Sequence, residues 1–187
     1  MCKAVAVTVA LLMTWAAAGA TPLIDVGTFD LRPDEAGQTI QIFVTGSDEV
    51  QGLEFNAQIG TGASGPLFEY CDILTDTVFA ESNTGLNDGS YIDPRRLYVG
   101  TSAASGTPVY ADGLLATLLL DTTGLQSGRW PLMLENSFEG STNFAGADVE
   151  ITNGWLVIEE IPEPASAAVL CLATVLIRRR RRSGRGA

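Results

Sequence analysis

The chain has 187 residues and is acidic, with 22 Asp and Glu residues against 11 Lys and Arg residues. It has no histidine, which excludes Ser-His-Asp and Cys-His catalytic arrangements and histidine-ligated metal sites. The acidic surplus also argues against a nucleic-acid partner, because two polyanions repel each other.

Residues 1–20 predict a secretory signal peptide. Lys3 precedes an apolar stretch at residues 4–12, and Ala18-Gly19-Ala20 is an A-x-A cleavage site. The apolar stretch is too short for a membrane-spanning helix. We therefore expect a signal helix that enters the Sec translocon and is removed by signal peptidase after Ala20, so that the mature chain begins at Thr21.

Residues 21–160 predict one acidic β-domain. This body has 21 acidic residues and four arginines, a net charge near −17. Its length of about 140 residues suffices for one hydrophobic core. Cys71 is its only cysteine, which excludes an internal disulfide, and its place in an apparent strand predicts a small core residue.

The clearest strand signal lies in residues 51–59. Apolar residues alternate there with Glu54, Asn56 and Gln58, which predicts a half-buried strand with one wet face. The inward row would be Leu53, Phe55, Ala57 and Ile59.

Further strands are predicted at residues 23–31, 39–44, 67–74, 97–101, 114–120, 130–134 and 149–158, the last with a turn or bulge at Asn153-Gly154. Gly and Pro separate them, and no part of the body shows a long helical period. The sequence therefore predicts an all-β fold: an antiparallel jelly-roll-type sandwich of about eight or nine strands. Residues 60–66 and 81–90 are predicted loops.

The second loop is the one candidate metal site. Asn83, Asn87, Asp88 and Asp93 offer oxygen ligands of the kind that Ca²⁺ prefers, and Gly85 and Gly89 permit tight turns. The loop lacks the D-x-D-x-D-G ladder of a calcium site, so an ordinary Asn/Gly/Asp turn is the preferred interpretation. No metal or cofactor is predicted, and Ca²⁺ stays as the alternative.

No enzyme is predicted. The body has too many carboxylates for any pair to be singled out as catalytic, and it has no phosphate-binding glycine loop. Five aromatic residues offer rings for stacking on sugars: Tyr91, Tyr98, Tyr110, Trp130 and Trp155. Because the two tryptophans adjoin apolar strand residues, core packing is the preferred interpretation.

The order of three motifs in the body resembles cohesin-like domains. These are the strand at residues 39–44, then Val50-Gln51-Gly52-Leu53-Glu54-Phe55, and later Asp112-Gly113-Leu114-Leu115-Ala116-Thr117-Leu118, with Phe79 and Asn83 between them. Cohesin-like domains are jelly-roll sandwiches related to some carbohydrate-binding modules. The resemblance implies this fold, and it implies a dockerin-like module held against one sheet face.

The tail has three parts in sequence. Pro162-Glu163-Pro164 precedes an uncharged apolar run at residues 165–177, which is shorter than the roughly 17–20 residues of a comfortable membrane helix. A basic block follows, and the positive-inside rule keeps it in the cytoplasm. Its members are Arg178, Arg179, Arg180, Arg181 and Arg182.

This tail, residues 161–187, resembles a PEP-CTERM sorting signal. The resemblance implies that the precursor pauses in the inner membrane through a short apolar helix. An exosortase-like membrane transpeptidase then cuts near Pro162, Glu163 and Pro164 and delivers the body to the cell envelope or extracellular matrix.

Two functions follow from these patterns. The first is a secreted, non-catalytic envelope or matrix protein with a cohesin-like domain for adhesion or protein assembly. The alternative is a carbohydrate-binding or weakly hydrolytic module that acts on extracellular polysaccharide.

Overall fold

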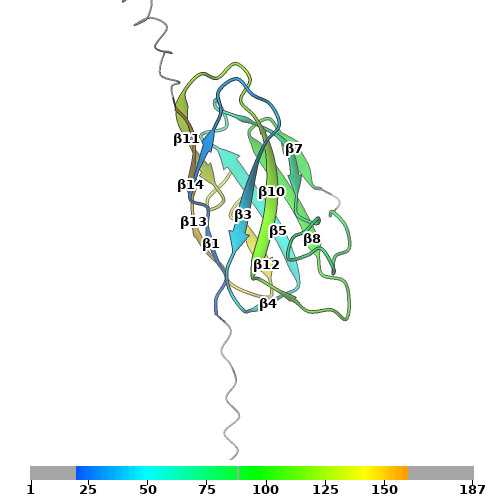
Figure 1. The fold of residues 1–187 in the computed structure, drawn as a ribbon. Helices are drawn as coiled ribbons and strands as arrows, with labels where there is room; N and C mark the ends of the chain where they lie inside the picture. The colour runs from blue at the N-terminus through cyan, green and yellow to red at the C-terminus, as the bar shows by residue number, and fades with distance from the viewer. Residues whose placement is uncertain (1–19, 88, 160–187) are drawn as a thin grey trace, which may run out of the picture.

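The strands form two β-sheets that face each other (Figure 1). Alternating apolar residues of these strands are buried between the sheets. The computed structural model describes residues 20–87 and 89–159, and this part of the chain is built of strands and loops alone. The all-β sandwich prediction is confirmed. The predicted signal helix and the predicted apolar C-terminal helix lie outside the described residues. Within the described ranges, no helix is long and apolar enough to cross a membrane.

The first sheet has β10 (Gly113–Asp121) at its centre. It pairs antiparallel with β3 (Gln38–Val44) on one side and with β6 (Leu67–Asp72) on the other. β1 (Leu23–Asp25) adjoins β3 through a bridge in which Leu23 and Thr45 exchange N–H···O bonds of 2.8 and 3.0 Å. β1 also pairs in parallel with β13 (Glu150–Thr152).

The second sheet is larger, and its strand order is β2-β14-β11-β5-β8-β7. The bounds are β2 (Thr28–Leu31), β14 (Gly154–Ile158), β11 (Gly128–Met133), β5 (Gly52–Ile59), β8 (Arg96–Ser102) and β7 (Tyr91–Asp93). β12 (Asn143–Ala145) pairs with β5 beyond the end of β11. Two short strands, β4 (Glu49–Val50) and β9 (Val109–Tyr110), pair with each other separately.

Two predicted strands are each divided in the structure. Residues 23–31 form β1 and β2, and residues 149–158 form β13 and β14, because both segments pass from one sheet to the other. Gly27 turns with a φ of 71°, and a Cβ at Gly154 would collide with the Gly27 carbonyl oxygen, so the crossing needs both glycines. The two segments pair in parallel, so the antiparallel prediction is wrong for the β1–β13 and β2–β14 pairs.

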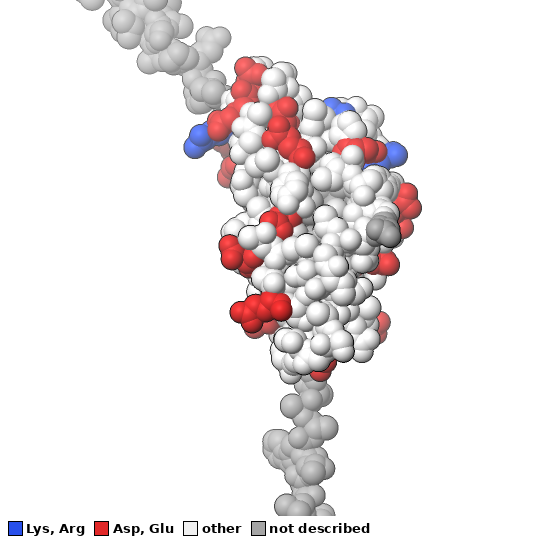
Figure 2. Space-filling view, turned by 90° about the vertical axis from the view of Figure 1, so that its right-hand side faces the viewer, with Lys and Arg blue, Asp and Glu red and all other residues white. Residues whose placement is uncertain are grey.

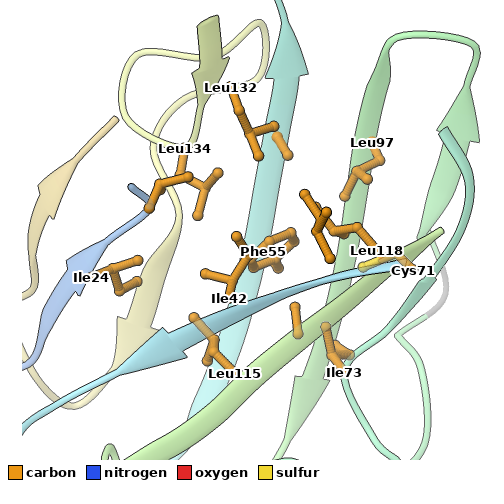
Figure 3. Packing of buried hydrophobic residues seen from close by; sticks show 14 of the residues in the cluster. Ile24, Ile42, Phe55, Cys71, Ile73, Leu97, Leu115, Leu118, Leu132 and Leu134 are labelled. Atoms are coloured by element: carbon orange, nitrogen blue, oxygen red, sulfur yellow. The ribbon is translucent and has the colours of Figure 1, made fainter. Parts of the chain in front are cut away.

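The core lies between the sheets around Phe55 (Figure 3). The inward row of β5 is confirmed, since Leu53, Phe55, Ala57 and Ile59 are all buried. Cys71 is also buried, as predicted, and burial followed by the nearby Asp72 charge raises the pKa of its thiol.

The expected wet face of β5 is wrong at one position. Asn56 is only 2% exposed, because the chain between β11 and β12 folds across it. Thr142 Oγ1 accepts the Asn56 backbone N–H at 3.0 Å and donates to the Asn56 carbonyl at 2.8 Å. This covering segment, residues 135–142, shapes the surface described next.

Candidate interaction surface

The predicted calcium loop uses its oxygen atoms to hold its own backbone. Asn83 Oδ1 accepts the Gly85 N–H at 3.0 Å, and Asn83 Nδ2 donates to the Phe79 carbonyl at 2.8 Å. Asp93 Oδ1 accepts the Arg95 N–H at 3.0 Å. Asp88 lies outside the described residues. Among residues 20–87 and 89–159, no group of three or more acidic or cysteine side chains is arranged to hold a metal.

The five aromatic residues singled out in the sequence divide between core and surface. Trp130 is half-buried against the core, as expected, with Gly60 and Gly65 beside its ring. The core-packing prediction is wrong for Trp155, which is 38% exposed because its position on β14 faces outward. Tyr110 is also exposed, and it lies apart on β9.

Trp155 belongs to a pair on the outer face of the larger sheet. The Arg129 guanidinium lies 4.1 Å from the centre of the Trp155 ring, a cation–π contact between neighbouring strands β11 and β14. The flat guanidinium stacks on the ring face.

A second group lies on the same outer face, over β7 and β8. The Tyr91 and Tyr98 rings are 6.3 Å apart, and Phe138 meets Tyr91 edge-on at 5.7 Å. The Arg96 guanidinium carbon is 5.4 Å from the Phe138 ring centre. Glu139 accepts a hydrogen bond from the Tyr91 hydroxyl at 3.1 Å. We call these residues together with the Arg129–Trp155 pair the aromatic–arginine face: Tyr91, Arg96, Tyr98, Arg129, Phe138 and Trp155.

Both tyrosines of this face keep their protons far above neutral pH. Desolvation and the hydrogen bond to Glu139 raise the pKa of Tyr91 to about 12. Desolvation, followed by the charges of Glu54 and Glu139, also raises the pKa of Tyr98. Both hydroxyls are therefore neutral; the Tyr91 proton is held by Glu139, and the Tyr98 hydroxyl can donate to a bound partner.

Two buried polar atoms lie beneath or beside the covering segment without a hydrogen-bond partner in the described part of the chain. They are Asn56 Oδ1 and Arg96 Nε. Asn56 Nδ2 has only a long bond of 3.4 Å to the Ser141 carbonyl. An unpaired buried polar group costs free energy, so the contact between the covering segment and β5 is less favourable than its burial suggests.

The positive charge of the body is concentrated near this face. Of its four arginines, Arg96 and Arg129 belong to the face, and Arg95 Nε donates to the Gly65 carbonyl at 3.0 Å in the loop at residues 60–66. Acidic side chains are spread over the view in Figure 2, whereas the few basic ones lie toward one end. The aromatic–arginine face is therefore a locally mixed-charge surface on an acidic body.

The amino-acid sequence carries only part of the signal for this face, since neither Phe138 nor Arg96 is predicted from it as a site residue. The one local signal for Phe138 is an aromatic residue within the polar stretch Glu135-Asn136-Ser137-Phe138-Glu139-Gly140. A large apolar residue in such a stretch either packs on a distant element or serves a partner, and Phe138 packs on Tyr91 and Arg96.

The predicted sorting and processing residues lie mostly beyond the described ranges. Ala18, Pro162, Glu163, Pro164 and the block from Arg178 to Arg182 are among them. Ala20 is described: its N–H donates to Ser47 Oγ at 2.7 Å, and its carbonyl accepts the Ser47 N–H at 3.1 Å. Cleavage after Ala20 remains a prediction.

Known proteins match this chain in structure and not in sequence. No protein-family model matches it, and no curated protein matches it. It is similar to the third ScaB cohesin of R. flavefaciens, solved with a group 1 dockerin, at 14% identity and a TM-score of 0.51, over 77% of this chain and 99% of that one.

Two further cohesins are similar at the same level. One is the third ScaC cohesin of Acetivibrio cellulolyticus, solved with the ScaB dockerin: 15% identity, TM-score 0.50, 73% of this chain and 98% of that one. The other is the OlpC cohesin of a type I cohesin–dockerin complex from Clostridium thermocellum: 16% identity, TM-score 0.50, 76% of this chain and 96% of that one. The body is therefore a cohesin-like β-sandwich, as the sequence motifs predicted.

Proposed function

We propose that this chain is an exported, non-catalytic module that assembles with another protein through its aromatic–arginine face. The observation that carries the proposal is the pair of arginine–aromatic contacts on one outer sheet face, Arg129 on Trp155 and Arg96 on Phe138. Tyr, Trp and Arg are the residues enriched at the energetic centres of protein interfaces. The rigid sheet beneath them holds these side chains in place before a partner arrives, which lowers the cost of binding.

The partner we propose is a dockerin-like module. The three similar cohesins were each solved with a dockerin, and the shared fold supports a related kind of partner here. The acidic body, near −17, favours a partner that is basic around its contact surface, because long-range attraction speeds association.

Export and sorting complete the proposed function. Residues 1–20 act as the signal peptide, residues 21–160 as the sandwich domain and residues 161–187 as the sorting tail. The Sec translocon and signal peptidase process the front of the chain, and an exosortase-like transpeptidase acts at Pro162, Glu163 and Pro164. The precursor is held in the inner membrane, and the product is released to the envelope or matrix.

Replacing Pro162, Glu163 and Pro164 by alanine tests the sorting step. We expect residues 21–187, cleaved after Ala20 but with the tail retained, to accumulate in the inner membrane. Intact-mass measurements on membrane and extracellular fractions read both ends at once. A triple variant that reaches the exterior with its tail removed would contradict this route.

Exposed rings on the same face favour one alternative, binding of extracellular polysaccharide. Trp155 and Tyr91 are each 38% exposed, and aromatic rings stack on sugars. A glycan array with the body and its Trp155→Ala and Tyr91→Ala variants separates the two functions. We expect no glycan to bind. A glycan retained by the unmodified body and lost with either variant would replace assembly by carbohydrate binding.

A further inference from the structure

A groove separates two consecutive strands that run side by side without pairing. β2 and β3 are joined by residues 32–37, yet β2 belongs to the larger sheet and β3 to the smaller one. The groove between them has a volume of about 490 Å³ and is lined by residues 28–32, 35 and 37–40. Among its apolar lining residues, Leu31 and Ile40 are buried and Phe29 is only half-buried, so Phe29 supplies most of the apolar surface that the groove offers.

Both walls of the groove are strand edges with unused backbone groups. On β2, the Gly27 carbonyl accepts the Trp155 N–H at 2.9 Å, so Gly27, Phe29 and Leu31 turn their backbone groups toward β14. The groups of Thr28 and Asp30 point the other way, into the groove, because successive residues of a strand alternate. β2 pairs only with β14, so these groups have no strand partner in the described part of the chain.

The β3 wall is arranged in the same way. Thr45 exchanges both backbone bonds with Leu23 of β1, so the alternate residues Gln41 and Thr39 also direct their backbone groups away from β10. β1 then turns away at Gly27 and leaves these positions facing the groove. An unpaired strand edge is a template for another strand.

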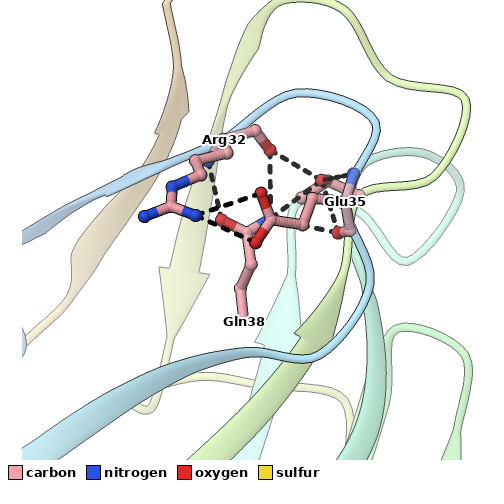
Figure 4. Close-up of polar contacts among 4 residues, drawn as sticks. Arg32, Glu35 and Gln38 are labelled. Carbon is pink, nitrogen blue, oxygen red and sulfur yellow. Dashed lines mark hydrogen bonds and ion pairs between the residues drawn. The ribbon is translucent and has the colours of Figure 1, made fainter.

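At the closed end of the groove, a side chain already takes the place of such a strand (Figure 4). Gln38 Oε1 accepts the Arg32 N–H at 2.7 Å, and Gln38 Nε2 donates to the Arg32 carbonyl at 3.0 Å. A side-chain amide thus pairs with Arg32 as the peptide group of a neighbouring strand would. Thr122 Oγ1, which is buried, also donates to the Arg32 carbonyl at 2.7 Å and fixes this end.

The charge around the groove selects the kind of strand. Asp30 and Glu35 line it, and the one cation of its lining, Arg32, is already held by Glu35 at 3.2 Å. The body as a whole is near −17. Basic side chains on an incoming strand would therefore meet the Asp30 carboxylate, which has no cation beside it in the lining, and acidic ones would be repelled by the acidic body.

From these observations we propose that the β2–β3 groove binds an extended segment of another protein as an added strand. The segment carries apolar residues at alternate positions, facing Phe29, Leu31 and Ile40, and basic residues between them, on the side of Asp30. Its backbone pairs with Thr28 and Asp30 on one side and with Thr39 and Gln41 on the other. The groove borders the aromatic–arginine face, because Trp155 of β14 pairs with Thr28, but it uses the opposite edge of β2. The proposal does not depend on the assembly proposed for that face.

The test uses the full chain labelled for NMR and a synthetic hexapeptide, acetyl-Lys-Val-Lys-Val-Lys-Val-amide. We expect the amide signals of Thr28, Asp30, Thr39 and Gln41 to shift and to exchange more slowly with solvent. The same peptide N-methylated at alternate residues keeps its charge and loses the N–H groups along one edge, so it cannot pair with both walls and should bind at least tenfold more weakly. A Glu-for-Lys peptide should also bind at least tenfold more weakly. Equal binding of the N-methylated peptide, or shifts confined to another surface, would overturn the proposal.

A matched pair of variants tests the β2 wall. Asp30→Pro and Asp30→Ala both remove the carboxylate, but only proline removes the N–H that faces the groove. Proline is tolerated on an edge strand where its N–H position faces outward. We expect peptide binding to Asp30→Pro to be at least fivefold weaker than to Asp30→Ala. Equal affinities would overturn pairing at this position. If Asp30→Pro does not fold, the N-methylated peptide still measures the contribution of backbone pairing.

A chain that ends at Glu159 tests whether the groove binds another protein or the basic tail of this same chain. Equal peptide binding by this chain and the full chain supports an external partner. Binding that appears only in the shortened chain would assign the groove to the basic tail of this same chain and would overturn the external partner.

Discussion

Replacing Phe55 by alanine tests the packing on which the fold rests. Phe55 is fully buried on the central strand β5, with Ile42 of the facing sheet nearby (Figure 3). Burial of this kind predicts a loss of about 3–5 kcal/mol in the free energy of unfolding, from lost transfer energy and the cavity left behind. A body of about 140 residues unfolds with an entropy of about 0.3 kcal/mol/K, so the melting temperature should fall by roughly 10–17 °C.

Phe43→Ala is the matched control. Phe43 lies on the outer face of β3 and is 52% exposed, so the same chemical change should cost less than about 1 kcal/mol. Urea titrations and calorimetry of both variants measure the two losses. If Phe55→Ala cost no more than Phe43→Ala, the assignment of the inward row of β5 and the core around it would be refuted.

Three further predictions concern charge. Raising NaCl from about 20 to about 300 mM should raise the melting temperature by a few degrees, because salt screens the repulsion within a body near −17; a flat or falling response would show that this repulsion is negligible. At matched ionic strength, calcium and magnesium should act alike, and Asp88→Ala should change neither response, because the described Asn83 and Asp93 oxygens already accept backbone N–H groups; a calcium-specific increment lost in Asp88→Ala would show that the loop holds the ion. In an alkaline absorbance titration, Tyr91 should ionise last of the four tyrosines, because its folded-state pKa is raised from 10.0 to about 12. The stability that Tyr91 contributes through this raised pKa is complete below pH 10 and is lost as the pH rises through 12. Glu139→Gln should lower the pKa of this last step, and an unchanged last step would exclude Glu139 as a cause of the raised pKa.

The sheet architecture was predictable where a local sequence pattern, such as apolar–polar alternation, indicated it. Alternation in residues 51–59 identified β5 and its inward row, and the order of motifs between residue 39 and residue 118 indicated a cohesin-like sandwich. The division of residues 23–31 was not predictable, because alternation along a strand does not reveal which sheet the strand joins. Gly27 permits the crossing, but the need for it arises from the close approach of Gly154, far along the chain.

The aromatic–arginine face was less accessible to prediction, because it depends on contacts between distant segments. Tyr91 and Glu139 are 48 residues apart and meet only through the register of β7, β8 and β5 and the path of the covering segment. Asn56 illustrates the same limit: its place in an alternating strand predicted exposure, and a non-local segment buries it. The sorting residues were found from the order of motifs alone, and they remain predictions.

Photo-crosslinking from position 98 reports whether another protein docks on the aromatic–arginine face. A benzophenone amino acid in place of Tyr98 reports on the aromatic–arginine face, and the same group in place of Phe43 reports on the opposite sheet. After irradiation of intact cells, mass spectrometry should identify one protein crosslinked through position 98 and much less of it through position 43, and Arg129→Ala should reduce the yield several-fold. Equal crosslinking at the two positions, or no protein captured through position 98 from the exported form, would contradict assembly through this face.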